Sequence, residues 1–506
     1  MSVGGGLEIV ALGERAWRFA IDDAWDRKRL LAQLRGIAAV TDVVIAEASA
    51  AVWFEQERDA PGIRAALAGI RGREGEGEGE GEGEGARAHV VRVVYDGEDL
   101  ADVARAVGVP LAAVVAMHAG ATYDVASIGF MPGFAYLRGL DPRLVLPRRA
   151  SPRTRVPARS VAIAAGYTGI YPSPSPGGWH LLGEAVDFVP FTDRGAAFAV
   201  GDRVRFEPIP RERASAATRD DASARTTATT RDVPPRHGQR WLEVTAVRAP
   251  ALLVDGGRPG HLHEGIARGG PLVRAAFGAA NARAGNPSGA CGVELYGAID
   301  VVARGGPITI ADHRGARTLA ANEALTVAPP PAMRAGYLAV RGGIDVPPFL
   351  GSRTTLLSAQ RGGLDGRPLA RASRLVVAEA PLAADHAPLA EQAPAAAHAR
   401  IDVLPGPDHD PAVLAALLAS AFTIAPGAGR SGTRLLGPPV PLSVHSAHDR
   451  RSAPMARGAI ELTPAGLIVL GPDHPTTGGY PVVAVLREHA LDAFFAIPPG
   501  GAVRFA

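Results

Sequence analysis

This chain of 506 residues contains only one cysteine and one lysine. The single cysteine, Cys291, excludes an intramolecular disulfide framework and fits a reducing cytoplasm. Because Lys28 is the only lysine, the sequence has no G-x-x-x-x-G-K-[ST] phosphate loop, no lysine placed for a Schiff base and no lysine suited to biotin attachment. We therefore expect no covalently bound cofactor, and any ATP or biotin would be handled at an unfamiliar site or through a partner.

Long apolar runs are also missing. No stretch of about 18 uninterrupted apolar residues occurs, so the sequence predicts no membrane-spanning helix and no membrane partner. The first 15 residues lack a basic region followed by an apolar core, which argues against a secretory signal and favours a cytoplasmic protein. The formal net charge of +2 gives no reason to expect a nucleic-acid partner.

The residues that are abundant predict a folded, mainly β protein. Hydrophobic residues make up 47% of the chain, which is ample for packed cores, and the length predicts three or four domains at about 150 residues each. Short apolar runs broken by 43 prolines and 61 glycines favour small β-barrels over βαβ units. The predicted fold class is mainly β with α/β parts, comprising two barrel modules, a small N-terminal α/β domain and a β-rich middle domain.

Composition divides the chain into five predicted segments. An α/β domain with a solvated Glu-Gly tether at 74–85 comes first, and a disordered linker poor in large apolar residues separates the two halves. The last module follows an Ala/Pro-rich stretch at 380–399. The predicted boundaries are 1–120 for the α/β domain, 121–210 for the first barrel, 211–240 for the linker, 241–399 for the β-rich domain and 400–506 for the second barrel.

Two Pro/Gly-rich segments, 152–183 and 453–485, look like versions of one module. Each begins with a turn containing Pro and Arg, continues with a short β-branched run and reaches the pattern Thr-Gly-x-Tyr-Pro, at 168–172 and 477–481. Binding residues concentrate in loops held by a rigid sheet. We therefore expect these two loops to occupy equivalent places and to carry binding chemistry.

Three ordered motifs in the first half, at 127–137, 139–144 and 147–157, closely resemble the B-type component of 5-oxoprolinase. This is the allophanate hydrolase subunit 1 domain, also seen in the Kip inhibitor of a sporulation histidine kinase. The second half resembles the C-type component, the allophanate hydrolase subunit 2 domain. Its motifs lie at 255–260, 280–287, 336–347, 350–355 and 473–481. The resemblance covers nearly the whole chain outside the linker and the Glu-Gly tract, and it implies a fused protein with cyclophilin-like barrels.

The resemblance implies a component of bacterial 5-oxoprolinase, which opens the lactam of 5-oxoproline to glutamate at the expense of ATP. A separate A-type subunit is then the expected partner, and ATP is the expected cofactor, handled with that subunit. One alternative is the carboxyltransferase part of urea carboxylase, in which paired domains move a carboxyl group from biotin to urea. Another is a Kip-type regulator of a histidine kinase. Homo-oligomerisation stays open.

The oxoprolinase and carboxyltransferase reactions both act on a small amide. A site for either needs cationic donors for an anionic or tetrahedral oxygen and a group that manages the amide proton. Arginines in the matching motifs suit the first task, because a guanidinium fork binds carboxylate and phosphoryl groups, although each could instead pair with a surface Asp or Glu. The candidate substrate-binding residues are Arg148, Arg153, Arg155, Tyr171, Arg258, Asn281, Arg353, Thr476 and Thr477.

The candidate catalytic residues are Asp473, His474, Tyr480 and His118. Asp473 and His474 offer a carboxylate and an imidazole side by side. The hydroxyls of Tyr480 and Tyr171 could donate to a substrate carbonyl, or each ring could be a packed aromatic. His118 stands where the family commonly has His. We expect no metal site, because the group His261, His263 and Glu264 lacks the H-E-x-x-H spacing.

The chain also departs from the family pattern at several polar positions. It has Val273 for the usual Asp, Gly429 for Asp, Glu461 for Gln, Arg159 for Gly, Tyr167 for Gln, and Ala372 with Ser373 for a Gly-Asp pair. If Val273 replaces a catalytic carboxylate, activity is impaired or the substrate is changed. Such losses favour the regulator, whereas the joined halves argue against it because inhibitor and antagonist would be permanently coupled.

Overall fold

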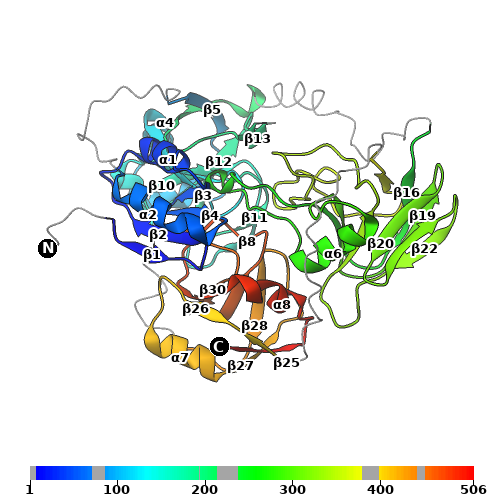
Figure 1. Ribbon diagram of the computed structural model, residues 1–506. Helices are drawn as coiled ribbons and strands as arrows, with labels where there is room; N and C mark the ends of the chain where they lie inside the picture. The colour runs from blue at the N-terminus through cyan, green and yellow to red at the C-terminus, as the bar shows by residue number, and fades with distance from the viewer. Residues whose placement is uncertain (1–6, 71–85, 193, 214–237, 379–397, 442–450) are drawn as a thin grey trace.

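The computed structural model describes residues 7–70, 86–192, 194–213, 238–378, 398–441 and 451–506 (Figure 1). The Glu-Gly tract and most of the two stretches at 211–240 and 380–399 lie outside the described residues. The chain is mostly β and contains two barrel-like sheets, which confirms the predicted fold class.

The N-terminal domain is an antiparallel sheet with strand order β1-β2-β4-β3. Because side chains alternate across a strand, Val43 and Val52 face the helices while Val44 and Trp53 face the second half of the chain. Asp26 caps the first helix by accepting from the Arg29 N–H at 3.0 Å. The elements are β1 (Ile9–Ala11), β2 (Ala16–Ala20), α1 (Arg27–Arg35), β3 (Val40–Ile45), β4 (Ser49–Phe54), η1 (Glu57–Asp59) and α2 (Ala60–Ala68).

Seven strands close the first barrel in the order β10-β7-β6-β15-β5-β12-β9. The strands are β5 (Ala88–Val94), β6 (Thr122–Ile128), β7 (Ala135–Arg138), β9 (Ser160–Ala164), β10 (Tyr167–Ile170), β12 (His180–Ala185) and β15 (Arg203–Pro208). The barrel thus draws on strands from both sides of residue 121, where the sequence places a domain boundary. Its other elements are α3 (Leu100–Val107), α4 (Leu111–Gly120), η2 (Pro142–Leu144), β8 (Arg153–Val156), β11 (Ser175–Gly177), β13 (Phe191–Thr192) and β14 (Gly195–Ala196).

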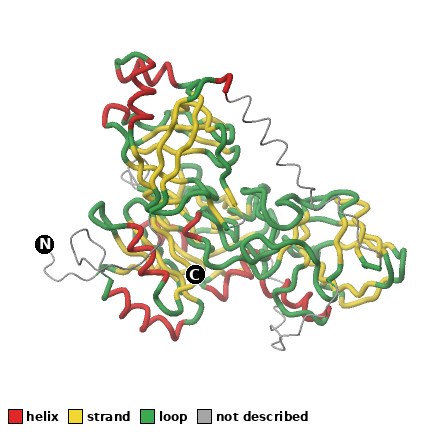
Figure 2. Tube along the Cα trace, turned by 90° about the horizontal axis from the view of Figure 1, so that it is seen from above, coloured by secondary structure: helices red, strands yellow, loops and turns green. Residues whose placement is uncertain are grey.

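The middle domain packs two antiparallel sheets around an aliphatic core. It lies at the right of Figure 1, away from the N-terminal domain, and the rotation to the tube view of Figure 2 keeps it at the right. One sheet contains β16 (Trp241–Val247), β19 (Ile299–Arg304), β22 (Ala324–Val327) and β24 (Arg374–Val376). The other contains β17 (Ala251–Val254), β18 (Gly292–Leu295), β20 (Ile308–Asp312), β21 (Gly315–Leu319) and β23 (Gly336–Val340), with η3 (Leu262–Glu264) and α6 (Arg274–Ala284) in its connections.

The second barrel is an eight-stranded sheet in the order β25-β34-β27-β28-β31-β30-β33-β26. Its strands are β25 (His398–Ile401), β26 (Val403–Pro405), β27 (Ala421–Ile424), β28 (Gly432–Leu436), β30 (Ala459–Thr463), β31 (Gly466–Leu470), β33 (Val482–Leu486) and β34 (Ala502–Phe505). The remaining elements are α7 (Pro411–Ala419), β29 (Ala453–Pro454), β32 (Thr477–Gly478), η4 (Glu488–Ala490) and α8 (Leu491–Ala496).

The two barrels repeat one arrangement, but the two Thr-Gly-x-Tyr-Pro patterns are not equivalent within it. The hairpin β9–β10 corresponds to β30–β31, and the two-stranded flap β8–β11 corresponds to β29–β32. Thr168 therefore lies on a barrel strand, whereas Thr477 lies in a flap. The predicted equivalence is wrong. By strand pairing, residues 177–179 (Gly-Gly-Trp) correspond to residues 478–480 (Gly-Gly-Tyr).

An apolar contact and several ion pairs join the two halves. Val44 and Trp53 of the N-terminal sheet pack with Met455 and Val482 of the second barrel. Ion pairs between the halves include Arg268–Asp42 at 2.6 Å, Arg18–Asp408 at 2.5 Å and Arg487–Glu14 at 2.8 Å. Among the described residues, none of the helices has by itself the length and apolar composition of a membrane span. The helices α3 and α4 reach that length and composition only when they are taken together, and the chain bends by 94° between them.

Candidate active site

Loops from both halves meet between the barrels. The Phe130 N–H, just after β6, donates to Thr477 Oγ1 at 3.0 Å, and the Gly133 N–H donates to the Glu264 carbonyl at 3.1 Å. A Cβ on Gly129 would lie 2.0 Å from Thr477 Oγ1, so this approach requires glycine. Phe130 has φ +65° although it is not glycine, and its side chain is 39% exposed. The junction is therefore tightly built and has a strained aromatic residue at its surface.

A chain of buried ionic groups holds the start of the loop between β31 and β33. Arg430 donates to Glu294 at 2.6 Å and to both oxygens of Asp473 at 2.6 and 2.9 Å. Glu294 also accepts from the hydroxyls of Tyr296 and Tyr337, at 2.7 and 3.0 Å. Removing one partner of a buried charge pair leaves the other uncompensated. The network thus fixes the Asp473 side chain in one orientation.

Arg258 lies next to this network, but its side chain makes fewer hydrogen bonds than that of Arg430. Its side chain is 1% exposed, and its Nη2 donates to the Thr354 carbonyl. Its Nε and Nη1 have no hydrogen-bond partner among the described residues. Burial lowers the pKa of Arg258, and the carboxylates of Asp255 and Asp473 oppose that shift. A Cβ built on Gly269 would lie 3.5 Å from Arg258 Nη1 and 3.6 Å from Asp473 Oδ1.

Asp255 ties together two of the motifs that carry the resemblance. Its Oδ1 accepts from the hydroxyls of Ser352 and Thr354 at 2.6 and 2.7 Å, and its Oδ2 accepts from the Arg353 N–H at 2.5 Å. The Arg353 side chain turns to the Val346 carbonyl, 2.9 Å from Nε. The loop around residue 354 is therefore positioned by a carboxylate from the end of β17.

His474 follows Asp473 but points to a different partner. Its Nδ1 donates to the Pro475 carbonyl at 2.8 Å, which leaves Nε2 with a lone pair. Burial lowers the pKa of His474 to about 4, so the ring is neutral near neutral pH. Thr476 Oγ1 is buried and lacks a partner among the described residues. Asp473 and His474 are neighbours in the sequence, but their side chains contact different residues. The Asp473 carboxylate is held by Arg430, and the neutral His474 imidazole donates to the Pro475 carbonyl.

Tyr480 lies near the end of the same loop, at a groove of about 390 Å³ between the second barrel and the N-terminal sheet. Its side chain is 42% exposed. Gly478 and Gly479 line the same groove, together with Arg18, which pairs with Asp408 through two hydrogen bonds at 3.1 and 2.5 Å. Tyr480 is therefore accessible to a ligand that enters this groove.

Glu461 is a residue that the sequence analysis missed as a site residue. It lies on β30 below the loop, and a Cβ on Gly478 would lie 2.9 Å from its Oε1. The carboxyl is 6% exposed, and burial raises its pKa to about 7. A carboxylic acid with a pKa near neutrality can give or take a proton under ordinary conditions. The signal for it was the replacement of the family's usual Gln by Glu.

Three first-half candidates lie in networks that hold the first barrel together. Arg153 donates to both oxygens of buried Asp99, each at 2.8 Å. The Tyr171 side chain is 1% exposed, its hydroxyl bonds the backbone of Trp179, and burial raises its pKa to about 12. His118 is fully buried between the Tyr95 hydroxyl and Thr168 Oγ1, at 2.7 and 2.8 Å, and burial lowers its pKa to about 3. Their functional roles stay predictions.

The other candidates divide between the surface and the interior. Arg148 and Arg155 are exposed and make no ion pair with a described residue. Asn281 is fully buried and its Nδ2 donates to the carbonyls of Ser288 and Ala290, at 3.2 and 3.0 Å. Val273 packs in the core of the second half, where its N–H donates to the Tyr337 hydroxyl at 2.8 Å. Tyr337 thereby links Val273 to the buried carboxylate of Glu294.

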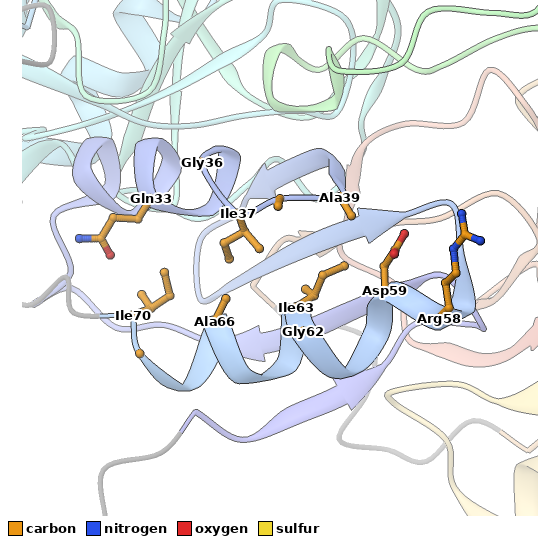
Figure 3. A pocket seen from close by; sticks show the side chains of 12 residues that line it. Gln33, Gly36, Ile37, Ala39, Arg58, Asp59, Gly62, Ile63, Ala66 and Ile70 are labelled. Carbon is orange, nitrogen blue, oxygen red and sulfur yellow. The ribbon is translucent and has the colours of Figure 1, made fainter.

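A larger groove of about 830 Å³ lies away from all of these residues, between α1 and α2 (Figure 3). Ile37, Ile63 and Ile70 line it, with Arg58 and Asp59 at one end. It brings together no candidate residue. Over the described ranges, no group of three or more His, Cys, Asp or Glu side chains is arranged to hold a metal ion.

Models of known domain families match both halves. Residues 7–194 match the carboxyltransferase domain, subdomains C and D, and residues 264–506 match subdomains A and B of that domain. The chain is 45% identical to the B-type 5-oxoprolinase component of Escherichia coli O157:H7 over 123 residues, which cover 23% of the chain and 56% of the relative. It is 31% identical to the C-type 5-oxoprolinase component of Escherichia coli K12 over 270 residues, which cover 50% of the chain and 86% of the relative.

A solved structure matches nearly the full length. The crystal structure of TTHA0988 superposes with a TM-score of 0.79 at 30% identity, covering 97% of this chain and 99% of that one. By contrast, the match to the B-type relatives spans about half of their length, between 45% and 56%. The arrangement of both halves in one chain is thus shared with a known structure.

Proposed function

Because the chain belongs to the carboxyltransferase-domain family, which it shares with the B-type and C-type components of 5-oxoprolinase, we propose that it is the fused B–C component of a 5-oxoprolinase. In this role it acts with a separate A-type subunit and ATP to open the lactam of 5-oxoproline to glutamate. The observation that carries the proposal is that regions similar to two different 5-oxoprolinase components occur in one chain and meet through their loops at Phe130 and Thr477.

The loop between β31 and β33 supplies groups suited to amide chemistry. When a lactam carbonyl is attacked, its oxygen gains negative charge and a proton must be removed from the attacking water. We assign proton acceptance to Nε2 of neutral His474 and donation to the carbonyl to the Tyr480 hydroxyl. Glu461, with its pKa raised by burial to about 7, is a second proton carrier beneath the same loop.

ATP, when bound, would supply the phosphoryl group that activates the lactam oxygen. The residues of this chain that fit its phosphates are Arg148 and Arg155, because both are exposed cations without an ion pair to a described residue. The sequence has no G-x-x-x-x-G-K-[ST] phosphate loop, so the remaining contacts are assigned to the A-type subunit.

The second candidate function is biotin-dependent carboxyl transfer to a small amide. The specific observation that favours it is that the matching domain models are those of a carboxyltransferase. Lys28 on α1 is the only lysine, so in this alternative biotin would be carried by a partner protein.

The deciding experiment measures glutamate formed from 5-oxoproline and ATP by the purified chain, with and without a purified A-type subunit. We expect glutamate and ADP only when both proteins are present. No glutamate under either condition would overturn the proposal. A parallel reaction with carboxylated biotin and a set of small amides then tests the second candidate, which predicts transfer of the carboxyl group without ATP.

A further inference from the structure

The groove at Tyr480 is a cavity that both halves of the chain enclose. Val10 and Phe19 line it from the N-terminal sheet, and Pro407 and Ala453 line it from the second barrel. Its volume of about 390 Å³ falls within the range of small-molecule sites, which run from about 300 to 1,000 Å³ and combine an apolar lining with a few polar groups. The polar groups of this groove therefore indicate which ligand it suits.

The flap β29–β32 contributes two long polar side chains to the groove, Arg451 and Tyr480. In this flap Ala453 pairs with Gly478, and the antiparallel register, continued by two residues, sets Arg451 opposite Tyr480. Opposite residues of an antiparallel pair point to the same face, as do alternate residues along each strand. All four residues line the groove. A guanidinium and a phenol are thus presented to the same space.

Arg451 has a guanidinium that no described carboxylate holds through a hydrogen bond. Its ion pair with Glu47 has 3.8 Å between Nε and Oε1, which is longer than a hydrogen bond, and its side chain is 59% exposed. Arg18, the other arginine of the lining, donates to both carboxylate oxygens of Asp408, at 3.1 and 2.5 Å. The N–H donors of Arg451 therefore remain for a ligand, whereas those of Arg18 that bond Asp408 do not.

A contact between the halves fixes the backbone beside Arg451. The Ser452 carbonyl accepts from the Glu47 N–H at 3.3 Å, and the Ser452 N–H donates to the Glu47 carboxylate at 3.4 Å. Glu47 lies between β3 and β4, and the adjoining Ala48 and Ser49 line the groove. The cation thus belongs to the second half of the chain, while the first half sets where it enters the groove.

We propose that this groove binds a small amide that carries a carboxylate, with the carboxylate on Arg451 and the amide carbonyl oxygen on the Tyr480 hydroxyl. A guanidinium fork binds a carboxylate through two parallel N–H···O bonds, so Arg451 selects acids over neutral amides. The remaining charged residue of the lining, Glu8, is exposed, so solvent screens its repulsion of the ligand. The choice of 5-oxoproline as the ligand rests on the proposed function.

Removing the carboxylate from the ligand tests the role of Arg451. Titration calorimetry on the full chain would compare 5-oxoproline with 2-pyrrolidone, which is the same lactam ring without the carboxylate. We expect 5-oxoproline to bind at least tenfold more tightly, and this preference should shrink at high salt because an exposed guanidinium is screened. Equal binding of the two lactams, or no binding of either at millimolar concentration, would overturn the inference.

Variants then assign each end of the ligand to its residue. Arg451→Met should remove the preference for 5-oxoproline and leave the affinity for 2-pyrrolidone unchanged, and Arg451→Lys should keep part of the preference because the charge remains without the fork. Tyr480→Phe should weaken both ligands by the same factor, since both carry the lactam carbonyl. Arg205→Met is the matched control, because Arg205 is exposed on β15 of the first barrel. It should leave both affinities unchanged.

Melting temperature and turnover separate this inference from a structural effect and from the proposed function. Because its side chain is 59% exposed, Arg451→Met should melt at the same temperature as the parent chain. A folded Arg451→Met that keeps the preference for 5-oxoproline would contradict the inference even if the chain turns this lactam over. Preferential binding of 5-oxoproline through Arg451 without turnover in the presence of the A-type subunit would contradict only the proposed function.

Discussion

The two flaps of the molecule have the same construction and opposite surroundings. After β11, Trp179 is 6% exposed and packs against Phe134 at a ring distance of 5.3 Å. At the equivalent place after β32, Tyr480 is 42% exposed and lines a groove. Beneath the first flap lies Ala162 on β9, and strand pairing puts Glu461 at the matching place on β30. The first flap is thus filled by aromatic core, and the second is left polar and accessible.

This difference indicates how a duplicated frame separates stability from chemistry. Phe134, Tyr171 and Trp179, which lie next to strands of the first barrel, stabilise it through apolar burial. The corresponding region of the second barrel holds a carboxyl whose pKa burial raises to about 7, next to a loop with a neutral His474. This contrast supports our proposal that the chemistry occurs at the second flap, while the first flap has a structural role.

The largest expected effect is on the stability of the first flap. Trp179→Ala should lower the free energy of unfolding by roughly 3–5 kcal/mol, because it removes a buried ring from a packed cluster. Tyr480→Ala should change it by no more than about 0.5 kcal/mol, since the ring is 42% exposed. Urea denaturation of both variants measures the difference. Equal losses in the two flaps would contradict the comparison.

A smaller effect depends on pH and concerns Glu461. Burial raises its pKa from 4.5 to about 7, so the folded chain holds this proton more tightly than the unfolded chain does. Its contribution to stability is complete below pH 4.5 and is lost as the pH rises through 7. Glu461→Gln should therefore match the parent at pH 4 and exceed its unfolding free energy by up to about 3 kcal/mol at pH 8.

The control for that experiment is Glu207→Gln, because Glu207 is exposed on β15. Its unfolding free energy should differ from that of the parent by the same small amount at both pH values. A Glu461→Gln effect that is equal at pH 4 and pH 8 would show that the Glu461 carboxyl is solvated. The difference between Glu461 and Ala162 would then give no support for proton transfer at the second flap.

The smallest effect concerns the contact between halves. Thr477→Val removes the acceptor of the Phe130 N–H and should cost about 1–2 kcal/mol. Hydrogen exchange should rise at the Phe130 amide, whereas Thr168→Val, which removes a hydroxyl from the interior of the first barrel, should leave that amide unchanged. Unchanged exchange in Thr477→Val would mean that the second flap does not hold the first-half loop.

The sequence predicts the β-rich fold and the barrels well, because short apolar runs between Pro and Gly have few other solutions. It wrongly predicts equivalent places for the two Thr-Gly-x-Tyr-Pro patterns. Thr168 and Thr477 occur in the same local pattern, yet the first lies on β10 and the second on β32. Local sequence does not specify which strand becomes the partner, since a hairpin and a flap can share the same turn residues.

The candidate site shows the same limit at the level of single side chains. Arg153 and Arg258 look alike in the sequence, as arginines within matching motifs. Whether a guanidinium is paired depends on distant residues: Asp99 pairs with Arg153, whereas no described carboxylate bonds Arg258. Glu461 was visible only as a departure from a pattern, because its raised pKa comes from burial that is created by the tertiary fold.

The most direct test of the central claim is glutamate release from 5-oxoproline and ATP by two matched variants together with the A-type subunit. His474→Gln alters the second loop, and Ser173→Ala alters the corresponding position of the first, where the hydroxyl bonds the Ser358 carbonyl at 3.1 Å. We predict that His474→Gln loses at least about 100-fold in turnover with its melting temperature preserved, while Ser173→Ala turns over as the parent does. Loss of turnover in Ser173→Ala with retention in His474→Gln would contradict the account.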